Sequence, residues 1–298
     1  MKKEVVLSLS SAFLLVLLLV PLVTRAARRA AVPMKEELEE HRAKAGTPQL
    51  GGLAMLPAFM LGMVYFSSER TAQISMISAV LFALIGYADD FMKIHLQSSD
   101  GLKSLHKLLL QCIAAAAISF LVRENAGLYE ELPSCIYYPS AIIYICAIVN
   151  SVNIVDGLDS LCIKSCAPAL VMVAIALPGA GPAPAVMLAV LVGFLFFNSK
   201  SATIFMGDGG SHLVGGAVAS VFLLSEHPLI CLVALALPLV EMLSSFVQIF
   251  SIRVFRRKVF LIAPLHHAFQ KNGMEEEKIA DRFLCVSAFF SLLAAYFL

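Results

Sequence analysis

Long apolar runs are the feature that most restricts what this chain can fold into. A helix needs about 20 mostly apolar residues to cross the hydrocarbon core of a bilayer. Ten runs of roughly this kind occupy residues 5–23, 51–66, 73–88, 105–122, 136–152, 160–178, 184–199, 211–225, 228–250 and 282–298. They lack the alternation of membrane strands. The sequence therefore predicts an all-α integral membrane protein, a bundle of about ten transmembrane helices forming one polytopic domain over residues 1–298.

Composition and charge distribution support a membrane protein with a defined orientation. Only 14% of the residues are charged and 59% are hydrophobic, whereas soluble domains carry roughly a quarter charged residues. Most of the 22 lysines and arginines lie in or beside the connections after the first, third, fifth, seventh and ninth runs. The positive-inside rule places those connections in the cytoplasm and both termini outside. We expect a lipid bilayer as the surroundings and no nucleic-acid partner.

The polar residues with catalytic potential gather on the same predicted cytoplasmic side. They lie in the connections 41–52, 86–107, 150–161, 198–211 and 263–273, whereas the connections on the other side are short and plain. This asymmetry predicts an active-site cleft at the cytoplasmic end of the helix bundle.

Two neighbouring carboxylates, Asp89 and Asp90, end the third run, and Lys93 follows one helical turn later. Carboxylates near lipid are costly to ionise without a cation. A solvated helix end is the plainer explanation, but acids and a lysine at a membrane surface suit Mg²⁺ together with phosphate.

The stretch "NIVDGLDSL" places Asn153, Asp156 and Asp159 three residues apart. Asp156 precedes Gly157, which predicts a turn or broken helix before the sixth run. A helix N-cap would explain one of these acids, but not three polar groups together.

The stretch "IFMGDGGSHLVGG" sets one carboxylate, Asp208, among glycines that let backbone approach closely. Ser211 is a candidate N-cap for the eighth run, and a helix N-terminus offers N–H groups to phosphate. An anion there would repel Asp208 unless a divalent cation bridged them. Mg²⁺ prefers one or two carboxylates with phosphate oxygens, so Asp208 is the first candidate for a metal ligand.

The stretch "APLHHAFQKNG" brings a histidine pair, His266 and His267. Pro264 is suited to begin a short helix and Gly273 to end it. The histidines are candidate donors to phosphate or to a base edge, and their spacing is poor for zinc. Glu241, inside the ninth run, is either functional or hydrogen-bonded within the bundle.

Taken in order, these stretches resemble the motifs of the polyprenyl-phosphate N-acetylhexosamine-1-phosphate transferases. "KAGTPQLGG", "GYADDFMK", "NIVDGLDSL", "FMGDGGS" and "APLHHAF" are similar to five motifs of that superfamily, from about His41 to Gly273. Within it, they most resemble the bacterial family that transfers phospho-N-acetylmuramoyl-pentapeptide. Three positions depart from the usual pattern, namely Gln49, Ser160 and Ala268, the last in place of a third histidine.

The resemblance implies ten transmembrane helices in the bacterial inner membrane, usually as a homodimer, with Mg²⁺ at a cytoplasmic active site. It implies UDP-N-acetylmuramoyl-pentapeptide and undecaprenyl phosphate as substrates and lipid I and UMP as products. The implied catalytic residues are Asp89, Asp90, Asp208, His266 and His267, with Asp208 holding the metal. The implied substrate-binding residues are Lys44, Thr47, Lys93, Lys107, Asn153, Asp156, Gly157, Leu158, Asp159, Asn198 and Phe205.

Two alternatives remain open from the sequence. A sibling transferase would use UDP-N-acetylglucosamine instead. A secondary transporter would place ionisable groups near the middle of the bilayer, whereas the acids here lie at the predicted cytoplasmic ends of the runs.

Overall fold

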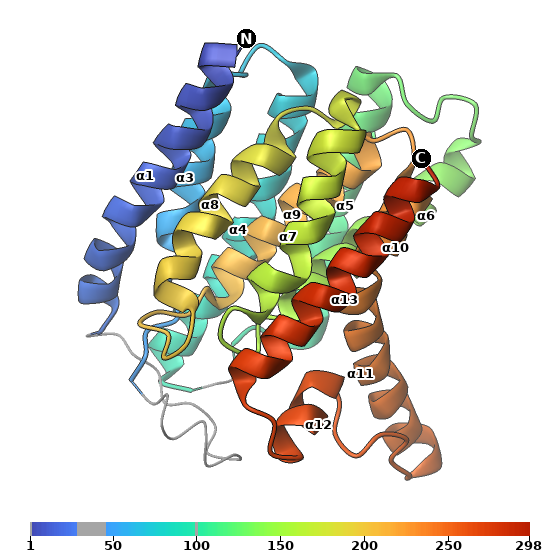
Figure 1. Ribbon diagram of the computed structural model, residues 1–298. Helices are drawn as coiled ribbons and strands as arrows, with labels where there is room; N and C mark the ends of the chain where they lie inside the picture. The colour runs from blue at the N-terminus through green and yellow to red at the C-terminus, as the bar shows by residue number, and fades with distance from the viewer. Residues whose placement is uncertain (1, 29–45, 99–100) are drawn as a thin grey trace.

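The computed structural model describes residues 2–28, 46–98 and 101–298, and within these ranges it is entirely helical apart from turns and loops (Figure 1). Lys44, a predicted phosphate contact, lies outside the described residues. The helices are α1 (Lys2–Ala27), α3 (Gly52–Val64), α4 (Arg70–Leu96), α5 (Ser104–Ala126), α6 (Ser134–Ile154), α7 (Leu161–Ala176), the 3₁₀ helix η2 (Pro178–Ala180), α8 (Ala183–Asn198), α9 (Gly207–Leu224), α10 (Pro228–Ala234), α11 (Ala236–Phe255), α12 (Leu265–Lys271) and α13 (Glu276–Tyr296).

Each predicted apolar run coincides with a helix, but the ninth is divided into α10 and α11 at Leu235. Pro238 lies in the first turn of α11 and has no N–H to donate to the carbonyl of Ala234, which explains why the helix restarts there. In the described part of the chain, six helices are long and apolar enough to cross a membrane, namely α1, α4, α5, α6, α11 and α13. Three apolar helices, α3, α7 and α8, are shorter. The protein is therefore an all-helical membrane protein, and the number of its spans stays a prediction.

Helix α9 lies in the middle of the bundle (Figure 1), and every residue from Gly209 to Leu224 is buried. Glycines bring α4 and α9 into backbone contact. A Cβ on Gly86 of α4 would collide with the carbonyl of Asp208, and one on Gly216 would lie 2.9 Å from the carbonyl oxygen of Ser78. The Ser78 hydroxyl donates to the carbonyl of Gly216 at 2.7 Å. This close packing fixes the start of α9 against the end of α4.

The segment before α3 is paired with the segment before α9. Backbone hydrogen bonds join Phe205 N–H to the carbonyl of Pro48 (2.8 Å), Gly51 N–H to that of Phe205 (2.9 Å) and Gly52 N–H to that of Met206 (2.9 Å). The loop after α8 is thereby held beside the α4–α9 contact. The short helix α12 lies between the ends of α11 and α13, on the side of the bundle where α9 begins (Figure 1).

Candidate active site

Helix α9 begins at Gly207, four residues before the predicted N-cap Ser211, so that prediction was wrong. The reason lies in α4. Both carboxylate oxygens of Asp90 accept backbone hydrogen bonds from the first turn of α9, from Asp208 N–H (3.0 Å) and Gly209 N–H (2.8 Å). An acid on a neighbouring helix thus supplies the cap that a residue just before α9 would normally provide.

The side chain of Asp208 is surrounded by cations and an amide from three other helices. Its Oδ1 accepts a hydrogen bond from Asn153 of α6 at 2.6 Å. Its Oδ2 is paired with the ammonium of Lys93 on α4 and with that of Lys107 on α5, the latter at 3.2 Å. Asp89 joins the cluster through an ion pair with Lys93 at 2.6 Å, and its Oδ1 accepts Leu102 N–H at 2.7 Å.

Three carboxylates converge at this point. Within the described residues, one oxygen from each of Asp89, Asp90 and Asp208 lies within 4.8 Å of the others. Such a cluster suits a hard cation that takes one or two carboxylates along with phosphate oxygens. Asp90 is already committed to capping α9. The carboxylates of Asp208, the predicted metal ligand, and of Asp89 are instead paired with Lys93.

Two cavities meet at the Asp208 cluster. The Phe205 cavity, of about 200 Å³, is lined by Gln49, Lys93, Asn153, Asp156, Gly157, Leu158, Asn198, Phe205, Gly207 and Asp208. The Lys107 cavity, of about 730 Å³, is lined by Asp89, Lys93, Gly101, Leu102, Lys103, Ser104, Lys107, Leu108, Gln111, Asn150, Asn153 and Asp208. Lys93, Asn153 and Asp208 line both. The arrangement can hold one anionic group in each cavity, with Lys93, Asn153 and Asp208 shared between the two.

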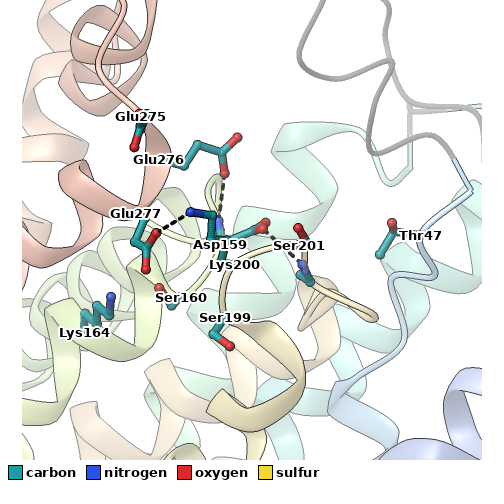
Figure 2. A pocket seen from close by; sticks show the side chains of 11 residues that line it. Thr47, Asp159, Ser160, Lys164, Ser199, Lys200, Ser201, Glu275, Glu276 and Glu277 are labelled. Atoms are coloured by element: carbon teal, nitrogen blue, oxygen red, sulfur yellow. Dashed lines mark hydrogen bonds and ion pairs between the residues drawn. The ribbon is translucent and has the colours of Figure 1, made fainter.

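Thr47 and Asp159, both predicted to bind substrate, line a different hollow (Figure 2). This Glu276 cavity, of about 810 Å³, is bordered by Thr47, Asp159, Ser160, Lys164, Ser199, Lys200, Ser201, Ala202, Glu275, Glu276 and Glu277. Two of its charged residues form an ion pair, in which Nζ of Lys200 lies 3.1 Å from Oε2 of Glu277. The Glu277 carboxylate raises the pKa of Lys200. Asn198 lies near both the Phe205 cavity and the Glu276 cavity. It lines the Phe205 cavity, and its Oδ1 accepts the N–H of Ser160, which borders the Glu276 cavity, at 3.1 Å.

The two histidines lie against the turn between α6 and α7, next to Gly157. His266 is fully buried, and its Nδ1 lies 3.1 Å from Oε2 of Glu241. A Cβ on Gly157 would lie 2.7 Å from Nε2 of His266 and 3.6 Å from Nε2 of His267. The histidines thus meet the wall of the Phe205 cavity at Gly157, without lining the cavity as Asp156 does. Glu241 is the buried, hydrogen-bonded acid that the sequence left as one of two possibilities.

Two polar residues near the cluster, His212 and Gln111, were not predicted from the sequence, whereas Asn150 lies in the 150–161 connection that was. His212 of α9 lies 2.9 Å from the carbonyl of Asp208 through Nδ1 and 3.0 Å from Gln111 through Nε2. Asn150 donates to Gln111 at 2.8 Å. These residues stand in predicted apolar runs, one or two turns beyond the motif residues. A helical projection that continued the polar face of α5, α6 and α9 inward would have found them.

Comparison with known proteins places these features in one family. The sequence model described as glycosyl transferase family 4 matches residues 72–226. A phospho-N-acetylmuramoyl-pentapeptide-transferase of Caldanaerobacter subterraneus subsp. tengcongensis is 36% identical over 83% of this chain and 83% of its own length. Its namesake from Thermotoga maritima is 35% identical over 95% of this chain and 96% of its own, and that from Clostridium acetobutylicum is 32% identical over 88% and 90%.

The match spans the helices that carry the three carboxylates, and the relatives cover nearly the full length of the fold. The chain therefore belongs to glycosyl transferase family 4 and, within it, to the phospho-N-acetylmuramoyl-pentapeptide-transferases.

Proposed function

We propose that this protein transfers phospho-N-acetylmuramoyl-pentapeptide from its UDP conjugate to undecaprenyl phosphate, giving lipid I and UMP. Family membership supports the reaction. The observation that carries it in the structure is the junction of two cavities at Lys93, Asn153 and Asp208. A phosphate attacking a diphosphate needs two anion sites that share one centre.

The Phe205 cavity suits the nucleotide. Its aromatic wall offers a stacking face for uracil, and Asn198 and Asp156 supply hydrogen-bonding groups. The Lys107 cavity suits the lipid phosphate, because Lys103 and Lys107 lie at its wall beside Leu108. The side chain of Leu108 is exposed on α5, as are those of Leu105 and Leu109. This apolar surface suits the first part of a polyprenyl chain.

The reaction follows from this placement. An oxygen of the lipid phosphate attacks the phosphorus that bears the sugar, and the bond from that phosphorus to the oxygen of UMP breaks. Asp89 receives the proton of a singly protonated lipid phosphate, and Lys93 lies where it neutralises charge between the two phosphates. A two-step route through a phosphorylated aspartate is the alternative. A labelled covalent adduct formed from the nucleotide alone would establish the second route.

Asp208 would hold Mg²⁺ in this scheme, while Asp89 acts as the proton acceptor. The bound ion supplies positive charge for the diphosphate and for the leaving UMP. The two lysines keep the same carboxylates compensated before an ion binds, since Lys93 contacts both and Lys107 lies 3.2 Å from Asp208.

We also propose the bacterial inner membrane as the location, with the cleft facing the cytoplasm, both termini outside and ten spans. Bacterial relatives and the positive charge beside the cleft support this orientation. Association as a homodimer is part of the same proposal and rests on the family.

The deciding experiment measures UMP release by the purified full chain with Mg²⁺, undecaprenyl phosphate and UDP-N-acetylmuramoyl-pentapeptide. Wild type should turn over, Asp208→Asn should lose at least about 100-fold, and Asp281→Asn should match wild type. Asp281 is a suitable control because it is exposed and pairs with Lys164 away from the cluster. Release from UDP-N-acetylglucosamine instead would assign the sibling activity, and nucleotide uptake into vesicles without UMP would assign transport.

A further inference from the structure

One face of α11 holds the chain that follows the helix. Oε1 of Gln248 accepts the backbone N–H groups of Val259 (3.0 Å) and Phe260 (2.9 Å), and its Nε2 donates to the carbonyl of Phe260 at 3.0 Å. The hydroxyl of Ser251, one turn later, donates to the carbonyl of Arg257 at 2.8 Å. Because every partner is a backbone group, the connection after α11 is fixed as a return turn alongside the end of the helix.

Four exposed cations gather at this turn, and we call them the cationic tip, namely Arg253, Arg256, Arg257 and Lys258. Arg256 has a positive φ of 56° and follows the last residue of α11, so the chain reverses there. No aspartate or glutamate occurs from Met242 to Met274. Among the residues that the structure describes, none of the four side chains forms an ion pair. Their charge is therefore uncompensated within that part of the fold.

Lysines elsewhere at this end of the bundle are paired with acids in or beside the first turns of α13. The pairs, with their N–O distances, are Lys164 with Asp281 (2.5 Å), Lys200 with Glu277 (3.1 Å) and Lys278 with Glu275 (3.4 Å). The cationic tip has no counterpart of this kind in the described chain. The contrast indicates that the tip is built for anions that the fold itself does not supply.

Exposed apolar side chains are interleaved with these cations. Phe255, between Arg253 and Arg256 in the chain, is 62% exposed, and Val259, directly after Lys258, is 57% exposed. Water would accept the charges but not the apolar groups, and hydrocarbon would do the reverse. The boundary between lipid headgroups and acyl chains accommodates both. Helix α11 is long and apolar enough to cross a membrane, and its end stands apart from the rest of the bundle at the lower right of Figure 1. The tip therefore reaches that boundary.

We propose that the cationic tip binds the headgroups of anionic phospholipids in the bilayer around α11, while Phe255 and Val259 insert among the acyl chains beneath them. Charge complementarity selects this occupant. Four uncompensated cations within six residues attract phosphodiester anions, and each basic residue near an anionic membrane surface adds to the attraction. The guanidinium groups also suit paired hydrogen bonds to phosphate oxygens.

This surface is separate from the site of the reaction. None of the four cations lines the Phe205 cavity or the Lys107 cavity. A phospholipid at the cationic tip would therefore leave both cavities open to the substrates. The inference goes beyond the proposed function and does not depend on the reaction that the protein catalyses.

The chain contains no tryptophan, so a single introduced indole reports on the lipids beside it. Val259→Trp places that indole at the tip, where the side chain is exposed and only the backbone N–H is bonded to Gln248. The full chain is reconstituted in bilayers that contain phosphatidylglycerol or phosphatidylcholine brominated on the acyl chains. Comparing the quenching by the two lipids gives their relative affinity at the tip. Phe255→Trp is the second reporter if Val259→Trp fails to fold.

At low ionic strength, phosphatidylglycerol should be preferred at the tip by at least about fivefold, and high salt should weaken the preference. The double substitution Arg257→Gln, Lys258→Gln should bring the ratio close to one. The matched control, Lys271→Gln, Lys278→Gln, removes two exposed cations from α12 and α13 and should keep the preference. The control reporter is Leu229→Trp, at the start of α10, where the side chain is 74% exposed and the nearest charged residue in the chain is Glu226. It should show no preference.

Equal quenching by the two lipids at Val259→Trp, or a preference that survives Arg257→Gln, Lys258→Gln, would overturn the proposal. So would an equal preference at Leu229→Trp, which would make it a property of the whole lipid shell. Inorganic phosphate added at matched ionic strength should leave the preference unchanged, and its loss would assign the tip to free phosphate instead. The fluorescence does not depend on turnover. A protein that prefers phosphatidylglycerol at the tip but releases no UMP would therefore refute the proposed function alone.

Discussion

The carboxylate of Asp90 on α4 caps the helix that carries Asp208, accepting the backbone N–H of Asp208 at 3.0 Å and that of Gly209 at 2.8 Å. The two acids contribute differently to one site. Asp208 turns its side chain toward Lys93 and Asn153, while Asp90 holds the backbone from which that side chain projects. Asp89, next to Asp90 in the chain, pairs with Lys93 instead. The two adjacent acids therefore have different roles.

Asp90→Asn tests the capping role. An asparagine has only one acceptor oxygen for two backbone donors, and its NH₂ group would face one of them. We expect a loss of about 1–3 kcal/mol in the free energy of unfolding, because one buried N–H group is left without an acceptor. Thermal unfolding in detergent measures it. Asp89→Asn is the comparison and should lose less stability, since Asp89 accepts only Leu102 N–H from the backbone.

Removal of divalent cations should stop the reaction. Treatment with EDTA should abolish UMP release, and added Mg²⁺ should restore it, because the diphosphate would otherwise meet Asp208 and Asp89 without enough positive charge. The check is UMP release before chelation, after it and after Mg²⁺ is returned. Full activity in the presence of EDTA would show that Lys93 and Lys107 alone supply the compensating charge.

The two lysines should differ in which substrate they affect. Of the two cavities that meet at Asp208, Lys107 lines the Lys107 cavity and not the Phe205 cavity. Lys107→Met should therefore raise KM for undecaprenyl phosphate by about tenfold or more and leave KM for the nucleotide nearly unchanged. Lys93 lines both cavities, so Lys93→Met should raise both. Measuring UMP release while varying one substrate at a time distinguishes these patterns. Equal effects of the two substitutions would contradict the assignment of the cavities.

Phe205 should matter for the nucleotide alone. Phe205→Ala removes the stacking face, which is worth about 1–3 kcal/mol for a base, and should raise KM for the nucleotide by about tenfold or more. Phe205→Tyr keeps the ring and serves as the control. Binding of UMP by calorimetry is a second measurement that needs no lipid. An unaltered UMP affinity in Phe205→Ala would place the base elsewhere.

The contact between α4 and α9 should not tolerate an added methyl group. A Cβ on Gly86 would collide with the carbonyl carbon and oxygen of Asp208. Overpacking of a rigid backbone contact costs about 1–3 kcal/mol or more, so Gly86→Ala should lower Tm and the yield of folded protein. Gly179→Ala is the matched control, because a Cβ there meets nothing within 4 Å. Equal Tm values for the two variants would argue against the close packing.

The sequence predicted which segments would meet, because each motif carried its own chemical signal. Asp89, Lys93, Asn153 and Asp208 do lie together, and the turn at Asp156 and Gly157 separates α6 from α7 as expected. The short helix after Pro264 was also predicted correctly. Acid and glycine patterns are local, so they can be recognised without a fold.

Other features could not be read from the sequence, because they depend on contacts between distant segments. The start of α9 was misplaced, since its cap comes from Asp90, 118 residues away. Thr47 and Asp159 line a hollow distinct from that of Phe205. Glu276 lies in an ordinary-looking acidic run, and its hydrogen bonds to Asp159 and Gln270 distinguish it from its neighbours. Hydropathy alone likewise missed the restart of the ninth run at Leu235.

Three side chains, Lys93, Asn153 and Asp208, belong to both cavities. An anion in one cavity therefore uses part of the positive charge that attracts an anion to the other. Occupancy of either side alters the affinity of the second, and by thermodynamic linkage the change is equal in both directions. The coupling requires no conformational change, because it passes through the one ammonium group that both ligands face. A divalent cation arriving with the diphosphate would reverse its sign, so that two mutually repelling reactants would favour each other's binding.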